Sequence, residues 1–168
     1  ELLDHLHSCG MGILRRYPSR QALEKSLADR YGVDPAQVLV TSGADEAIDR
    51  ACRAFLAPGR ELILPVPTFE MFDRYARLAG ATIRTVPWPA GDYPLGEVVA
   101  VLGPQTAAIA VVSPNNPTGA VARAADLCRL SEAAPQALLI LDAAYAEFAE
   151  DDLTADALGL PNAIVLRS

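Results

Sequence analysis

The sequence predicts an α/β protein: a three-layer α/β/α domain around a mainly parallel sheet, preceded by a short helical N-terminal element. Two observations support this prediction. Short apolar runs alternate with stretches of helical periodicity, and most of the runs are apolar throughout, as in strands covered on both faces. The expected strands are residues 38–41, 61–64, 82–86, 107–112, 137–142 and 163–167.

Helices are expected between these strands. Ser19 is a residue type that favours the N-cap, and Leu23, Leu27 and Tyr31 follow it at intervals of four, as on one helical face. Three further helices are expected: one that begins after Gly43, and two over about residues 69–78 and 122–133. In the first of these, Ile48, Ala51, Cys52 and Phe55 lie on one face; in the second, the residues expected to face inward are Phe72, Tyr75 and Ala79.

The order of these segments predicts two parts. Residues 1–31 are expected to form an N-terminal helical element belonging to a small domain, and residues 32–168 a partial large domain. A turn at residues 16–19 should divide the first part, because Pro18 disfavours helical backbone in the residue before it.

Composition and charge exclude several classes of protein. The chain has 168 residues, half of them hydrophobic, which suffices for one packed core. A net charge of −7 argues against a nucleic-acid partner, and no apolar run is long enough for a membrane span. Cys9, Cys52 and Cys128 are too widely spaced for a zinc site or a disulfide framework, and His5 and His7 lack further metal ligands. A cytoplasmic protein without a metal is expected.

Ligands bind beyond the carboxyl ends of the strands in parallel α/β sheets, so the residues that follow each strand are candidates for function. Residues 41–46, Thr-Ser-Gly-Ala-Asp-Glu, join a strand to a helix. Free amides at a helix start favour an anion such as phosphate, and Gly43 allows a close approach of the backbone. The alternative is that Ser42 and Asp45 cap the helix without any ligand.

Three other strand ends carry polar or aromatic groups. Residues 114–119, Pro-Asn-Asn-Pro-Thr-Gly, form either a simple turn or a site where an asparagine amide donates to a ligand oxygen. Asp142 ends an apolar strand, where a carboxylate either caps the next element or holds a protonated ring nitrogen within reach of Tyr145. Phe69 either belongs to the core or stacks on a planar ligand.

Six segments stand in a fixed order and spacing along the chain. They are Arg-Tyr-Pro-Ser at 16–19, Ser-Gly-Ala-Asp-Glu at 42–46, Pro-Thr-Phe at 67–69, Pro-Asn-Asn-Pro-Thr-Gly at 114–119, Asp-Ala-Ala-Tyr-Ala-Glu-Phe at 142–148 and Val-Leu-Arg-Ser at 165–168. Together they resemble the histidinol-phosphate aminotransferase group of the fold-type-I (class I/II) pyridoxal-phosphate (PLP) enzymes. The resemblance covers the chain from about Arg16 onward and implies an incomplete PLP-binding large domain.

The resemblance implies which residues would hold the phosphate of PLP. The amides of Ala44 and Asp45 would bind it. Tyr17 matches a tyrosine that reaches the cofactor phosphate of the partner subunit, which implies a homodimer with shared active sites.

The resemblance also implies which residues would hold the ring. Phe69 stands where the family has an aromatic residue, usually tyrosine, stacked on the pyridine. Asn116 and Tyr145 would bond to the phenolic O3′, and Asp142 would pair with the pyridine N–H and keep the ring protonated. Ala143 stands where the family commonly has glutamate.

The resemblance implies that no catalytic residue lies within the chain. In the family a lysine forms a Schiff base with PLP, and the family spacing implies that it follows Ser168 by about three positions. Lys25 is the only lysine of the chain, and it falls on what should be the solvated face of the N-terminal helix. The chain alone is therefore expected to be inactive.

The resemblance implies that the parent protein transfers an amino group between glutamate and a keto phosphate, imidazole-acetol phosphate. Two alternatives stay open. One is another reaction of a fold-type-I PLP enzyme, such as threonine-phosphate decarboxylation or C–S lysis. The other is a truncated domain without catalytic activity.

Overall fold

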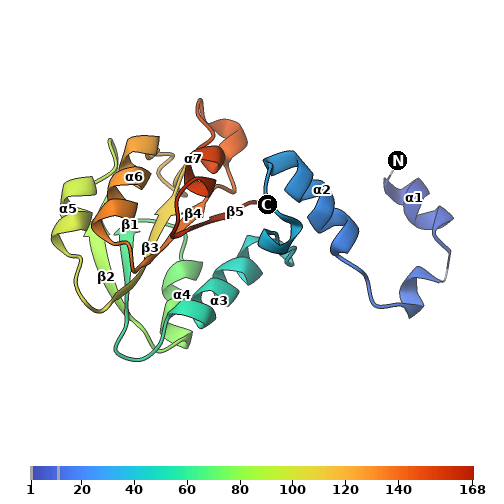
Figure 1. Cartoon of the computed structure of the whole chain (residues 1–168), viewed down its shortest axis with the longest axis horizontal. Coiled ribbons are helices and arrows are strands. Elements are labelled where there is room, and N and C mark those ends of the chain that lie inside the picture. The colour runs from blue at the N-terminus through green and yellow to red at the C-terminus, as the bar shows by residue number, and fades with distance from the viewer. Residues whose placement is uncertain (1, 11) are drawn as a thin grey trace. The chain divides into compact units, whose positions relative to one another are not determined.

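The computed structural model describes residues 2–10 and 12–168, and the contacts between Cα atoms divide the chain into two units, Glu1–Val40 and Thr41–Ser168 (Figure 1). The first unit contains the helices α1 (Leu2–Ser8) and α2 (Gln21–Tyr31) and the 3-10 turns η1 (Ile13–Arg15) and η2 (Pro35–Gln37). The division of the chain at residue 31 into parts of two domains stays a prediction.

The start of α2 differs from the expected one. Its N-cap residue is Arg20, which makes no side-chain capping bond, so the expected cap at Ser19 is wrong. Ser19 lies one residue before the N-cap position. A capping oxygen has to stand at the N-cap position itself to reach the amides of the second and third helical residues. The helix ends at a glycine, as many helices do: Gly32 has a φ of 66° and its N–H donates to the Ala28 carbonyl.

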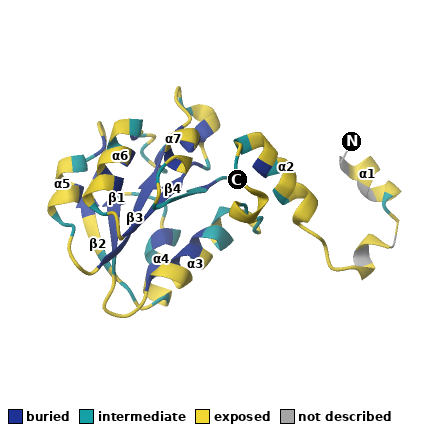
Figure 2. Ribbon diagram, in the orientation of Figure 1, coloured by how far each residue is buried: buried dark blue, intermediate teal, exposed yellow. Residues whose placement is uncertain are grey.

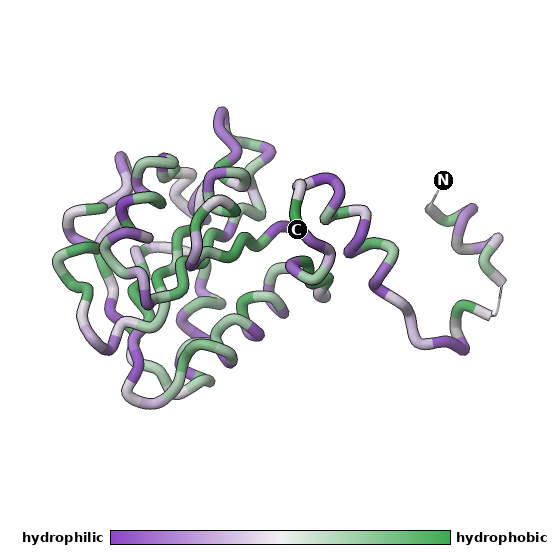
Figure 3. Tube along the Cα trace, in the orientation of Figure 1, coloured by the Kyte–Doolittle hydropathy of each residue, from purple (hydrophilic) through white to green (hydrophobic). Residues whose placement is uncertain are grey.

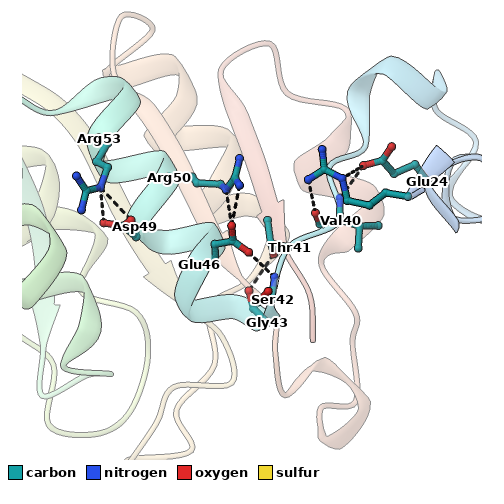
Figure 4. A network of polar contacts seen from close by, with 10 residues as sticks. Glu24, Val40, Thr41, Ser42, Gly43, Glu46, Asp49, Arg50 and Arg53 are labelled. Atoms are coloured by element: carbon teal, nitrogen blue, oxygen red, sulfur yellow. Dashed lines mark hydrogen bonds and ion pairs between the residues drawn. The ribbon is translucent and has the colours of Figure 1, made fainter. Parts of the chain in front are cut away.

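Residues 38–41 do not form the expected strand. Val38 has extended backbone, but the hydrogen bonds of Val40 go to the side chains of Arg20, the N-cap residue of α2, and Glu24, within α2, instead of a neighbouring strand. Arg20 Nη1 donates to the Val40 carbonyl at 3.0 Å, and Glu24 Oε1 accepts from the Val40 N–H at 3.1 Å (Figure 4). The apolar, β-branched pattern favours extended backbone, and a strand also needs a partner.

The second unit is built on a five-stranded parallel sheet of order β2-β1-β3-β4-β5. The other five predicted strands are confirmed, with ends that differ by up to two residues. Their bounds are β1 Glu61–Val66, β2 Thr82–Pro87, β3 Thr106–Val112, β4 Leu138–Asp142 and β5 Ala163–Leu166. The chain runs from β1 outward to β2 and then returns to β3 on the other side of β1, so a switch point lies between β1 and β3.

Helices cover both faces of this sheet, which confirms the predicted three layers (Figures 1 and 2). Side chains alternate between the faces along each strand, as the two-residue period requires. Ile63, Ile109 and Leu139 pack against α5 (Leu95–Ala100), α6 (Ala124–Ala133) and α7 (Thr154–Leu158). Leu62, Ala108 and Ile140 pack against α3 (Gly43–Phe55) and α4 (Met71–Leu78). In the trace of Figure 3, the central strands β3 and β4 are mostly hydrophobic.

Two helices were not predicted, and Phe55 differs in burial from the residues grouped with it. α5 has six residues and α7 has five, too short for a recognisable 3.6-residue period. Ile48, Ala51 and Cys52 are buried, whereas Phe55 is 50% exposed. It is the last residue of the helix, and the following residue, Leu56, is buried in its place.

Candidate functional site

A cavity of about 190 Å³ lies where the carboxyl ends of β3 and β4 approach the start of α3. It is lined by Ala44, Asp45, Phe69, Val112, Asn116, Asp142, Ala144, Tyr145 and Ser168. Six of the seven predicted cofactor residues are therefore brought together, from four separate segments of the second unit. Tyr17, the seventh, belongs to the first unit and its side chain is fully exposed.

The first turn of α3 contributes Ala44 and Asp45 to the lining of this cavity. Ser42 is the N-cap residue, but its side chain makes no capping hydrogen bond. The alternative in which Ser42 and Asp45 only cap the helix therefore does not hold for the Ser42 hydroxyl. Glu46 instead accepts from the Ser42 N–H and is itself held by Arg50, with its Oε1 2.7 Å from Arg50 Nη2 (Figure 4). The first amides of a helix have no intrahelical acceptor, so those of Ala44 and Asp45 can bind an anion.

Asp142 places a buried carboxyl group at the cavity. The residue is 3% exposed, and its Oδ1 accepts one hydrogen bond, from the Ala144 N–H at 3.1 Å. Among residues 2–10 and 12–168, the ion pairs of the structure do not include Asp142. Burial raises the pKa of this carboxyl, and the charge of Asp45 raises it further, against the opposing effect of the Ala144 bond. A cation or a protonated ring nitrogen beside Asp142 would relieve both effects.

The two adjacent asparagines after β3 have different surroundings. Asn116 is half-buried and lines the cavity. Asn115 is 3% exposed, and its side chain bonds to Pro67, Thr68 and Thr118 instead. The residue pattern alone did not distinguish the two asparagines. The resemblance named Asn116 alone as a ligand of the cofactor, and Asn116 is the one that lines the cavity.

Two aromatic side chains flank the site. Phe69 is half-buried, lines the cavity and also packs against the core between the sheet and α3, so the two predicted roles for it are compatible. Tyr145 is 47% exposed and tilts against Phe148, with the ring centroids 6.3 Å apart. Its hydroxyl is therefore free to approach a ligand in the cavity.

Ser168 and Ala144 line the cavity although no binding role was predicted for them. Ser168 was singled out only as the approach to the expected lysine. Its neighbour Arg167 ties the end of β5 to the segment after β4, because its guanidinium pairs with Glu147 and lies 2.9 Å from Asp152. That pairing joins two of the six segments on which the resemblance rests.

Other kinds of site find no support in the described part of the chain. Among residues 2–10 and 12–168, no three His, Cys, Asp or Glu side chains are grouped as metal ligands would be. No described helix is both long and apolar enough to span a membrane. Cys9, Cys52 and Cys128 are free thiols.

Known proteins resemble this chain in sequence. The family model described as aminotransferase class I and II matches residues 10–168. The histidinol-phosphate aminotransferase of Granulibacter bethesdensis is 36% identical over 141 residues, which are 82% of this chain and 38% of the relative. That of Paracoccus denitrificans is 36% identical over 159 residues, which are 92% of this chain and 43% of the relative. The chain thus spans about two fifths of the length of these curated relatives.

Solved structures resemble it in fold. The L-threonine-O-3-phosphate decarboxylase of Porphyromonas gingivalis superposes with a TM-score of 0.77 at 26% identity, over 98% of this chain and 50% of that one. The histidinol-phosphate aminotransferase of Sinorhizobium meliloti, solved in complex with PLP, superposes with a TM-score of 0.83 over 94% of this chain and 45% of that one. The second protein is 24% identical, so that likeness concerns the fold alone. The family match over almost the whole chain, together with this fold, shows that the chain belongs to the class I and II aminotransferases.

Proposed function

We propose that the protein that contains this chain is a PLP-dependent aminotransferase of the histidinol-phosphate type, which moves an amino group between glutamate and imidazole-acetol phosphate. The family implies PLP, and the names of the curated relatives support the substrate class. One observation of the structure carries the proposal: the buried carboxylate of Asp142 faces the same cavity as the free amides at the start of α3.

This donor set fits PLP at both of its polar ends. A buried carboxylate with a raised pKa and one hydrogen-bond partner fits a protonated pyridine nitrogen, which would pair with it and lower that pKa. The amides of Ala44 and Asp45, at the positive end of the α3 dipole, fit the phosphate.

Three side chains would fix the ring between these ends. Phe69 would stack on one face, and Asn116 and Tyr145 would donate to the phenolic oxygen. When bound, PLP supplies an electron sink for the Cα of an amino acid, and Asp142 keeps the ring nitrogen protonated so that the sink is effective.

The test is the half-reaction with glutamate. PLP and glutamate are added to the protein that contains this chain, and the absorbance should change from that of the pyridoxal form to that of the pyridoxamine form. A cofactor spectrum unaffected by glutamate, with PLP demonstrably bound, would refute the proposed aminotransferase activity. Comparing imidazole-acetol phosphate with other keto phosphates in the reverse direction then tests the substrate class.

A second candidate, the decarboxylation of an amino-acid phosphate, is favoured by the likeness to the threonine-phosphate decarboxylase. Both reactions use the same cofactor site, because the groups that hold the substrate select which bond at Cα is broken. Release of CO2 from threonine phosphate without amino transfer would favour this candidate.

Two further properties belong to the proposal. Lys25 lies exposed on α2 and is not proposed to hold PLP, so borohydride reduction of the chain with PLP should give no stoichiometric adduct there. The protein is proposed to be a cytoplasmic homodimer in which the exposed Tyr17 reaches the partner's cofactor phosphate. A Tyr17→Phe variant with unchanged PLP affinity in the dimer would contradict that role.

A further inference from the structure

β1 and β3 are neighbours in the sheet, but their pairing stops well before their carboxyl ends. It runs from Glu61 with Thr106 to Ile63 with Ile109, with an irregularity after Glu61. By contrast, the pairing of β1 with β2 continues to the end of β1 at Val66. The two strands therefore part on the side of the sheet where the cavity lies, at the switch point of the fold.

The side chain of Asn115 spans this opening. Its Nδ2 donates to the Pro67 carbonyl at 2.9 Å, and its Oδ1 accepts from the Thr68 hydroxyl at 2.7 Å, both in the loop after β1. Its Nδ2 also donates to Thr118 Oγ1 at 2.8 Å within its own loop. Because Asn115 is 3% exposed, water cannot readily replace these bonds.

Only a primary amide of this length satisfies all three partners. The Pro67 carbonyl can only accept, so it must face the amide NH2, and the Thr68 hydroxyl then donates to the amide oxygen. An aspartate at position 115 could accept from Thr68 but would oppose the Pro67 carbonyl with a second acceptor.

The residues next to this bridge line the proposed cofactor cavity. Phe69 follows Thr68 directly, and Asn116 follows Asn115 directly. The separation between the stacking side chain and the amide that would bond to the phenolic oxygen is therefore fixed through Asn115.

We propose that Asn115 is a positioning residue, which sets the loops after β1 and β3 at the separation that PLP requires and does not itself touch the cofactor. Its consequence for PLP rests on the proposed function. The bridge itself is a property of the folded chain and can be tested without cofactor.

The test compares three variants of the protein that contains this chain. Asn115→Ala removes the whole bridge, and Thr68→Val removes one bond of it and serves if the first variant does not fold. Ser113→Ala is the matched control: Ser113 is also buried in the loop after β3, but its Oγ accepts from the Ala122 N–H at 3.0 Å and makes no bond to the loop after β1.

Hydrogen exchange of the cofactor-free proteins tests the bridge. Asn115→Ala and Thr68→Val should raise exchange in the segments 66–72 and 113–120 together, whereas Ser113→Ala should raise it only in the second segment. Exchange that rises in the second segment alone in all three variants overturns the proposal.

Binding of PLP tests the consequence. Asn115→Ala should weaken PLP affinity by about tenfold and lower the visible circular dichroism per bound PLP, because the groups that orient the ring are displaced. Ser113→Ala should leave both unchanged even where it lowers the melting temperature equally. Affinity and dichroism that follow the melting temperature in every variant overturn the positioning role. Failure of the unmodified protein to bind PLP refutes the proposed function, and the exchange measurement then decides on Asn115 alone.

Discussion

Substituting Asp142 by asparagine removes the buried charge while keeping the oxygen that accepts from the Ala144 N–H at 3.1 Å. If Asp142 holds the pyridine N–H, the variant loses a hydrogen bond between two charged groups. Such a bond contributes about 1.5–3 kcal/mol, which corresponds to roughly 10- to 150-fold in PLP affinity. A titration of the two proteins with PLP, followed by fluorescence or absorbance, measures this difference.

The same substitution should stabilise the cofactor-free protein. Burial raises the pKa of the Asp142 carboxyl above its unfolded value, so the folded state binds this proton more tightly than the unfolded state does. The free energy of unfolding therefore falls as the pH rises from the unfolded pKa through the folded pKa, and the loss is complete above the latter. Asparagine cannot ionise, so the variant should be the more stable protein at neutral pH, and its advantage should shrink as the pH falls toward the unfolded pKa.

Urea denaturation of the two proteins across this pH range tests the sign. The matched control is Asp73→Asn on α4, where a hydrogen bond from Arg77 lowers the pKa of the carboxyl and the pair is largely exposed. In the control, the free energy of unfolding should fall by about 0.3–0.5 kcal/mol at neutral pH, and the PLP affinity should not change. A loss of stability in cofactor-free Asp142→Asn at neutral pH, or a PLP affinity within twofold of the native one, would refute the reasoning.

Three other variants and reactions test the account. Tyr93 has a buried hydroxyl with no hydrogen-bond partner among the described residues, so Tyr93→Phe should stabilise the protein by about 1 kcal/mol in thermal denaturation, and a loss of that size would show a hidden partner. Asn116→Ala should weaken PLP binding by about tenfold with little change in melting temperature. By contrast, the core variant Ile140→Ala should lower the free energy of unfolding by about 2–5 kcal/mol. Burial, then the charge of Asp49, raises the pKa of the Cys52 thiol to about 11, so alkylation of the folded protein should modify the exposed Cys128 and spare Cys52 until the protein unfolds; equal rates at both would contradict its burial.

The sheet was predictable from the sequence because its strands carry a local signal. Runs such as 107–112 are apolar at every position, and burial on both faces explains this pattern. Residues 38–41 show the limit of the same signal: their pattern resembles a strand, yet the partners of Val40 are the side chains of Arg20 and Glu24. The local sequence does not determine which partner a backbone group forms a hydrogen bond with.

The sequence predicts which segments form the candidate site, but not the role of every residue in them. Asp142 and the start of α3 follow from a charge at the end of an apolar strand and from a glycine before a helix. The resemblance named Asn116 as a cofactor ligand, but the role of Asn115 does not follow from the sequence, because it depends on a contact with Pro67 and Thr68, almost fifty residues away in the chain. Long-range hydrogen bonds of this kind leave no periodic pattern in the sequence.

The most direct measurement is a crystal structure of the protein that contains this chain with PLP bound. The phosphate should lie at the amides of Ala44 and Asp45, and the pyridine nitrogen should lie within hydrogen-bond distance of the Asp142 carboxylate. PLP bound elsewhere, or in this cavity with its phosphate turned toward Asp142, would contradict the account.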